Sequence, residues 1–153
     1  MAIIIPCAGR SSRFPGTRPK YLLTLYNGDT MFEKAAKDYP NQQIHFIILK
    51  EHEDQYKASE SIYKAFSDND EVYVHVLPEV TSGPAETVFS VTKNLSDMPI
   101  MIRDCDSFFD VEFKTTNHVC LADLRENKNI TNVAAKSYAV LNDQDLITNI
   151  VEK

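Results

Sequence analysis

Cationic side chains gather in one short segment near the start of the chain. The apolar residues 3–5 lead into a stretch rich in Gly, Ser and Pro that contains Arg10, Arg13, Arg18 and Lys20. Even spacing of the 22 acidic residues would place about four within the first 28 positions, but the first acidic residue is at position 29. The chain as a whole has a net charge of −6. A positive loop after a buried strand indicates an anionic ligand such as phosphate, and the alternative is a solvated basic loop.

Two carboxylates form a second group that could carry out chemistry. Asp104 and Asp106 lie at the end of residues 99–103 (PIMIR), which read as a mainly apolar strand. Ligands of open α/β sheets bind beyond the carboxyl ends of the strands, and Mg²⁺ favours one or two carboxylates together with substrate phosphates. The pair therefore fits a magnesium site, and an ordinary turn-capping role is the alternative.

The elements that would position these groups alternate between strand and helix, which favours an α/β fold with a largely parallel sheet. The patterns predict strands over residues 2–6, 44–49, 72–77 and 99–103. They predict one helix that begins after Thr30 and a second over residues 51–66, with Tyr63 among its inner residues. They predict a third helix from residue 82 or 83 to about residue 93. Residues 107–114 read as an edge strand, 119–125 as a short helix, and 131–141 with 146–151 as a hairpin around a turn at 142–143.

Composition narrows the class of protein. A chain of 153 residues with 43% hydrophobic residues fits a single domain spanning residues 1–153. It contains no apolar run long enough for a membrane helix and no signal peptide, so no membrane partner is predicted. Three widely spaced cysteines fit a reducing cytoplasm. The negative net charge disfavours a nucleic-acid partner.

The segment AGRSSRF followed by PKYLL resembles the signature loop of the sugar-nucleotide pyrophosphorylase type of nucleotidyltransferase, whose pattern is roughly AGGxGTRL and then PKxLL. The resemblance implies catalytic roles for Arg13 and Lys20. Ser11 replaces the usual second glycine of the pattern, and a serine resists positive φ. The nucleotide-binding residues that the resemblance implies in this loop are Ala8, Gly9, Arg10, Ser11 and Ser12.

Three further segments resemble the same family in the same order. Asp106 begins a DSFF segment similar to the family's GDxxF, with Cys105 in the glycine position, so Asp106 is the implied metal ligand and Asp104 an additional one. Gly83 matches the glycine of the family's LGTAxAV segment, which approaches the base, although a plain helix cap also explains it. The terminal Glu152 and Lys153 resemble the family's EKP segment, which contacts the sugar and its phosphate; a solvated tail is the alternative.

The resemblance implies a Rossmann-like three-layer sandwich with a mostly parallel mixed sheet. It also implies an enzyme that joins a nucleoside triphosphate to a sugar 1-phosphate, or a similar phosphorylated small molecule, with Mg²⁺ as cofactor and release of pyrophosphate. A homo-oligomer is compatible with it. Family catalytic domains continue beyond the last residue, so we expect a domain that is truncated at its C-terminal end and is incomplete or inactive. A cytidylyltransferase acting on a polyol or choline phosphate, and a regulatory nucleotide-binding module without turnover, stay open.

Overall fold

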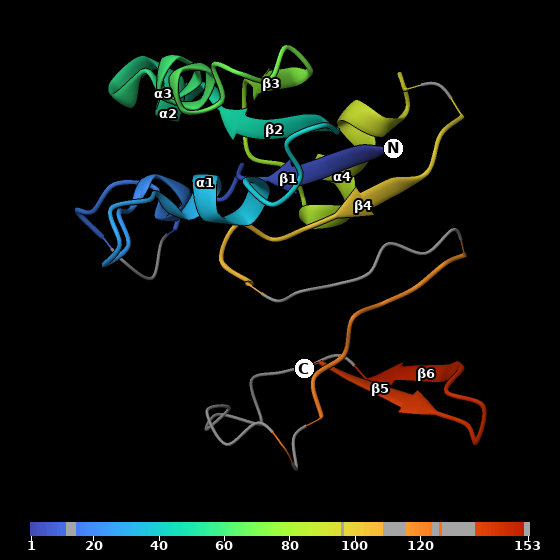
Figure 1. Cartoon of the computed structure of the whole chain (residues 1–153). Coiled ribbons are helices and arrows are strands. Elements are labelled where there is room, and N and C mark those ends of the chain that lie inside the picture. The colour runs from blue at the N-terminus through green and yellow to red at the C-terminus, as the bar shows by residue number, and fades with distance from the viewer. Residues whose placement is uncertain (12–14, 96, 109–115, 124–125, 127–136, 152–153) are drawn as a thin grey trace. The chain divides into compact units, whose positions relative to one another are not determined.

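The structure is a computed structural model that describes residues 1–11, 15–95, 97–108, 116–123, 126 and 137–151 (Figure 1). The chain divides into two compact units, Met1–Val111 and Glu112–Lys153. Within the described residues, no helix combines the length and the hydropathy needed to cross a membrane.

The first unit is built on a four-stranded parallel sheet. Its strands lie in the order β3-β2-β1-β4. Pairing is regular, with Ile3 opposite Ile44 and Met101, so β1 is central. Both faces of a parallel sheet are covered, and this explains why β1 and β2 are almost continuous apolar runs. The α/β fold predicted from sequence is therefore confirmed, with strands at β1 (Ala2–Pro6), β2 (Gln43–Leu49), β3 (Val72–Leu77) and β4 (Ile100–Ile102).

Helices cover the two faces of this sheet and complete three layers (Figure 1). The short 3-10 helix η1 (Lys20–Leu22) and α1 (Met31–Ala36) pack on one face, where Phe32 meets Phe46 edge to face. On the other face, Val88 and Val91 of α4 (Pro84–Thr92) pack against Ile4. Alternate residues of each strand thus enter two separate cores.

The start of α1 agrees with the prediction that Thr30 caps this helix. The backbone N–H of Glu33 donates to Thr30 Oγ1, and the Glu33 carboxylate accepts the backbone N–H of Thr30, which together form a capping box. This reciprocal pair fixes the direction of the chain between η1 and α1.

The predicted helix over residues 51–66 is wrong as a single element. It is two helices, α2 (Lys50–Tyr56) and α3 (Ala58–Ala65), separated by Lys57 with φ 50° and ψ 50°. The Glu53 carboxylate accepts the N–H of Ser59 at 2.8 Å and thereby caps the first turn of α3. The break also turns Tyr63 outward, to 48% exposure, so its predicted inner position is wrong as well.

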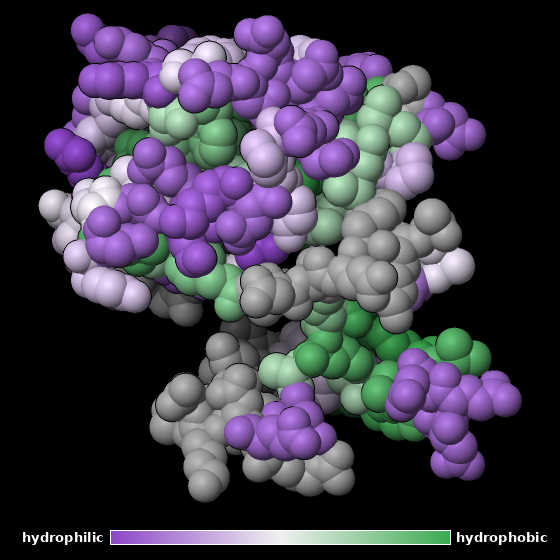
Figure 2. Space-filling model, viewed as in Figure 1, coloured by the Kyte–Doolittle hydropathy of each residue, from purple (hydrophilic) through white to green (hydrophobic). Residues whose placement is uncertain are grey.

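The second unit contains a hairpin where one was predicted, although residues 131–136 of the predicted first strand lie outside the described residues. Strands β5 (Tyr138–Leu141) and β6 (Ile147–Val151) are antiparallel, and the Asn142 side chain accepts the N–H groups of Gln144 and Leu146 in the turn. Every residue of β6 is exposed, and apolar side chains gather on the hairpin surface (Figure 2).

Two other predictions fall on less regular segments. Residues 119–123 are not helical, so the predicted helix over 119–125 is wrong there, and 124–125 lie outside the described residues. Val119 and Leu121 are exposed, so this segment lacks the packed apolar face that a short helix needs for stability. Residues 107–108 are irregular where an edge strand was predicted, and the remainder of that strand lies outside the described residues.

A hydrogen-bonded histidine pair joins β2 to β3. His45 Nδ1 and His75 Nε2 lie 2.9 Å apart, and the His45 ring also stacks on Tyr73. His45 is only 3% exposed, and its Nε2 has no hydrogen-bond partner among the described residues. Burial, aided by the charge of His75, lowers the pKa of His45 to about 4 from its ordinary 6.5, against the opposing effect of Glu71.

This pair predicts a loss of stability in mild acid. The unfolded chain takes up a proton on this histidine below about pH 6.5, whereas the folded chain resists until about pH 4, so stability falls as the pH falls through that window. Between pH 7 and pH 4.5 the loss from His45 is about 2 kcal/mol. Urea unfolding at the two pH values should show a smaller loss for His45→Phe than for the parent, whereas the exposed control His118→Gln should behave like the parent. An equal pH dependence in His45→Phe would contradict the assignment.

Candidate functional site

The strand order places a topological switch point beside β1. From β1 the chain adds β2 and then β3 beyond one edge of β1. It then returns and adds β4 along the opposite edge of β1. The loops that leave β1 and β4 begin at Cys7 and Arg103, so they separate at the carboxyl edge of neighbouring strands. Such a divergence is where open α/β sheets form their ligand crevice.

A cavity of about 200 Å³ lies at this switch point. It brings together Lys20 and Asp106, which are 86 positions apart and form an ion pair. About a third of each of the two side chains is exposed, so the pair is accessible to a ligand. The residues that line the cavity are Pro6, Cys7, Gly9, Ser11, Lys20, Tyr21, Cys105 and Asp106.

Ser11 holds the loop against the start of η1. Its Oγ accepts the backbone N–H of Lys20 at 3.1 Å, and its own φ is 52°. Few residues other than glycine adopt this left-handed conformation, because Cβ crowds the backbone. Ser11 therefore has the backbone conformation typical of glycine, at the position where the signature pattern has a glycine. Its hydroxyl in addition ties the loop to Lys20, the first residue of η1.

Arg10 is held by a chain of polar contacts that the sequence did not reveal. Arg10 Nε donates to Glu51 Oε1 at 3.1 Å, and His52 Nε2 lies 3.9 Å from the same oxygen. The Nδ1 of His52 lies 3.4 Å from the hydroxyl of Tyr21. Burial lowers the pKa of His52, so this buried ring is neutral at pH 7. The start of α2 thus links the basic loop to η1.

Two thiols form the floor of the same cavity. Cys7 is buried in the core, and burial raises its pKa; Cys105 is partly exposed, and its pKa is lowered chiefly by a hydrogen bond from Cys7. Sequence reasoning placed Cys105 only as a replacement for a family glycine, and it missed Tyr21 as a lining residue. The two thiols meet because β1 and β4 are paired in register.

The other predicted site residues have different surroundings. Ala8 is buried in the core beneath α4, and Asp104 is exposed and does not line the cavity. Arg10 and Gly83 do not line it either. The remaining predicted residues lie outside the described part of the chain; these are Ser12, Arg13, Glu152 and Lys153.

Gly83 precedes α4, with Pro84 as the first helical residue. The Glu86 carboxylate accepts the backbone N–H of Ser82 at 2.7 Å, and the side-chain and backbone hydrogen bonds of Ser82 lower the pKa of Glu86. An acidic side chain therefore already complements the positive end of this helix. These contacts match an ordinary helix start.

The carboxylate at the cavity suits a metal ion that is also coordinated by a bound ligand. Within the described ranges, no group of three or more His, Cys, Asp or Glu side chains is placed to hold a metal ion. One carboxylate, that of Asp106, faces the cavity. Mg²⁺ commonly binds through one or two carboxylates and completes its coordination with water and phosphate oxygens, so the donor set fits this ion when phosphate is also bound.

Comparison with known proteins gives an informative structural likeness. No protein-family model and no curated protein matches the chain. The structure is similar to a solved structure of the nucleoside-diphosphate-sugar pyrophosphorylase from Vibrio cholerae RC9, with 27% sequence identity and a TM-score of 0.56. The match covers 69% of this chain and 48% of that chain, so it spans about half the length of that protein. The likeness supports a nucleotidyltransferase-like α/β fold.

Proposed function

We propose that this chain is a nucleotidyltransferase whose switch-point cavity binds the phosphates of a nucleoside triphosphate. The observation that carries the proposal is the accessible Lys20–Asp106 pair, which places a cation and a candidate metal ligand together at the carboxyl edge of the sheet. The likeness to a pyrophosphorylase supports this kind of function. The acceptor is a sugar 1-phosphate or a similar phosphorylated small molecule.

The proposed reaction places most of its demand on positioning. A phosphate oxygen of the acceptor attacks the α-phosphorus in line, the bond to the β-phosphate oxygen breaks, and pyrophosphate leaves. Lys20 holds the triphosphate and offsets negative charge on the leaving group, and the resemblance gives Arg13 the same role. Glu152 and Lys153 would bind the acceptor. No side-chain nucleophile is needed, so catalysis depends on holding the two reactants in line.

The resting ion pair has a defined role in this proposal. Without ligand, Lys20 and Asp106 neutralise each other. A phosphate oxygen would replace Asp106 as the partner of Lys20, and the Asp106 carboxylate would then be free to hold Mg²⁺. When bound, the ion supplies positive charge to the phosphate oxygens. The small cavity, below the roughly 300 Å³ at which ligand pockets usually begin, fits a site that the ion pair partly fills.

Glu51→Gln tests the role of Arg10. Glu51 engages the guanidinium at 3.1 Å in an exposed setting, so its charge competes with phosphate for Arg10. Removing that charge should tighten triphosphate binding about two- to fivefold, which matches the roughly 0.5–1 kcal/mol of an exposed pair. Isothermal titration at 50 and 300 mM salt should show the gain mainly at low salt. Asp54→Asn on the same helix, which removes the partner of Lys50, is the control and should leave the affinity unchanged. A response equal to that of Asp54→Asn would show that Arg10 does not contact the ligand.

The function itself is tested by pyrophosphate release. Each common nucleoside triphosphate is combined with Mg²⁺ and with a panel of sugar 1-phosphates, polyol phosphates and choline phosphate. Acceptor-dependent release that Lys20→Ala abolishes supports nucleotidyl transfer, and the acceptor identifies the type. Binding of triphosphate without release from any acceptor would favour a regulatory nucleotide-binding module or the truncated, inactive domain that the resemblance implies, and not a domain that turns over by itself. Absence of both binding and release would overturn the proposal.

A further inference from the structure

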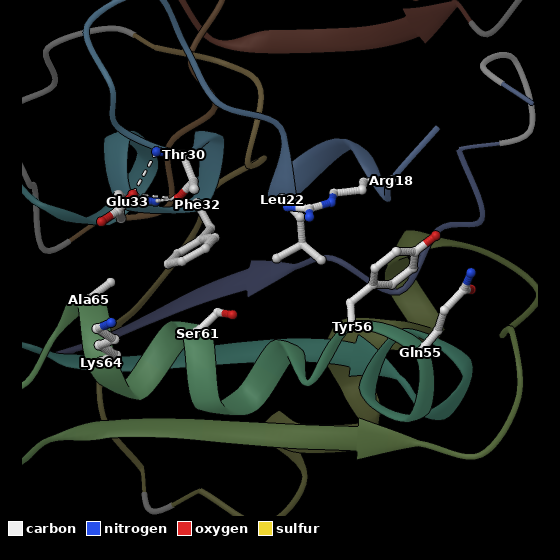
Figure 3. Close-up of a pocket in the computed structure, with 10 residues that line it drawn as sticks. All are labelled: Arg18, Leu22, Thr30, Phe32, Glu33, Gln55, Tyr56, Ser61, Lys64 and Ala65. Atoms are coloured by element: carbon white, nitrogen blue, oxygen red, sulfur yellow. Dashed lines mark hydrogen bonds between the residues drawn. The ribbon is translucent and has the colours of Figure 1, made fainter. Parts of the chain in front are cut away.

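A second and larger cavity lies among the helices of the first unit. Its volume is about 730 Å³, and it is bounded by η1 and α1 on one side and by α2 and α3 on the other (Figure 3). No residue of its lining belongs to the switch-point cavity. The lining consists of Arg18, Leu22, Thr30, Phe32, Glu33, Gln55, Tyr56, Ser61, Lys64 and Ala65.

The interior of this cavity contains three large apolar or aromatic side chains. Phe32 and Leu22 project into it from the η1 and α1 side, and Tyr56 extends from the end of α2 on the far side of Leu22, with its hydroxyl directed away from Phe32 (Figure 3). Phe32 and Leu22 are buried in the core, so their positions are fixed, while Tyr56 is only partly buried. Tyr56 therefore supplies most of the accessible apolar surface, and a partly exposed aromatic ring suits a planar apolar group; the volume lies within the usual range for small-molecule sites.

The rim of the cavity is positively charged. Arg18 and Lys64 are both exposed, and neither side chain has an ion pair or hydrogen bond with another residue in the described part of the chain. The one acidic lining residue, Glu33, is already engaged, because its carboxylate accepts from the N–H and Oγ1 of Thr30 at 2.6 and 2.7 Å. Two available cations beside an engaged carboxylate favour an anionic ligand.

Sequence alone placed Arg18 among the cations of the phosphate loop. The structure separates these cations, since Lys20 enters the switch-point cavity, Arg10 pairs with Glu51, and Arg18 lines the larger cavity. The buried Pro19 lies between Arg18 and Lys20 and precedes η1, so the two neighbouring cations serve different surfaces.

We propose that the larger cavity is a second ligand site, which takes a small anionic molecule with a planar apolar group, such as an aromatic phosphate or carboxylate. The planar group packs on the Tyr56 ring beside Leu22, and the anion is attracted by Arg18 at that end of the cavity and by the positive charge of Lys64 at the other end (Figure 3). This site is independent of the nucleotide site in its lining and in its cations.

Calorimetric titration of the 153-residue chain with phenyl phosphate tests this site. We expect one saturable site, with binding at least tenfold tighter than that of inorganic phosphate, which lacks the ring, or of phenol, which lacks the charge. The double variant Arg18→Gln/Lys64→Gln should weaken binding about tenfold, because two exposed charge contacts are lost. Lys93→Gln is the matched control, since it removes an exposed lysine after α4 outside the lining, and it should change the affinity less than twofold.

The same titrations with Lys20→Ala separate this site from the nucleotide site. Phenyl phosphate should bind Lys20→Ala as it binds the parent chain, and Tyr56→Leu should weaken it in both backgrounds. Loss of phenyl phosphate binding in Lys20→Ala would overturn the proposal, because the probe would then occupy the switch-point cavity. No measurable binding, or equal binding to the Arg18→Gln/Lys64→Gln variant, would overturn it as well. Neither result depends on whether the chain turns over a triphosphate.

Discussion

Lys20→Ala should weaken the binding of nucleoside triphosphates about ten- to a hundredfold. A hydrogen bond between charged groups is worth about 1.5–3 kcal/mol, and Lys20 is the cation that enters the switch-point cavity. The fold should be little affected, because a partly exposed ion pair such as Lys20–Asp106 contributes at most about 1 kcal/mol. The affinity loss should therefore appear without a matching loss of stability.

The measurement is calorimetric titration with each triphosphate, together with urea unfolding of the same samples. Lys50→Ala is the control, because Lys50 is also an ion-paired lysine but lies at the start of α2, outside the cavity lining. It should bind triphosphate like the parent. If Lys20→Ala also binds every triphosphate as tightly as the parent, Lys20 does not contact phosphate.

Asp106→Asn should change triphosphate binding in opposite directions with and without Mg²⁺. Without the metal, affinity should rise about two- to fivefold, because Lys20 loses the carboxylate that neutralises it and becomes free for phosphate. With the metal, the gain in affinity that Mg²⁺ gives the parent should disappear, because an amide replaces the charged ligand that a hard cation favours.

Triphosphate titrations in EDTA and in excess Mg²⁺ measure both effects in one series. Asp104→Asn is the matched control, since Asp104 is exposed and does not line the cavity. A response of Asp104→Asn equal to that of Asp106→Asn would make both carboxylates metal ligands. An unchanged Mg²⁺ dependence in Asp106→Asn would return Asp106 to a turn-capping role.

The sheet was the most predictable part of the fold. The first and third strands have the predicted bounds, the second begins one residue earlier, and the fourth is shorter than predicted. The first two were readable because a strand buried on both faces appears as an unbroken apolar run. The cap at Thr30 was also readable, since a Thr followed three residues later by Glu indicates a capping box. These features depend on local sequence alone.

Features that depend on tertiary contacts were not predictable. Lys57 has no sequence property that favours a left-handed conformation, and the Glu53 carboxylate caps the next helix across the break. The contact between Arg10 and Glu51 joins residues 41 positions apart on different elements. The hydrophobic periodicity of residues 51–66 fitted one helix, and it did not indicate the break at Lys57.

The residues of the candidate site were easier to predict than the contacts between them. The family resemblance singled out Lys20 and Asp106, and parallel strands bring their loops to one edge of the sheet. Spacing along the chain did not reveal that these two residues pair in the absence of ligand. Charge counting likewise grouped Arg18 with Lys20, although the two side chains line different cavities.

A crystal structure of the chain with a non-hydrolysable nucleoside triphosphate and Mg²⁺ would show whether the Lys20–Asp106 pair opens to bind phosphate and metal. We predict that a phosphate oxygen replaces Asp106 as the partner of Lys20, about 2.7–2.9 Å from Nζ. Asp106 should then coordinate the metal at about 2.1 Å. A bound triphosphate located elsewhere, with the Lys20–Asp106 pair intact, would contradict the account.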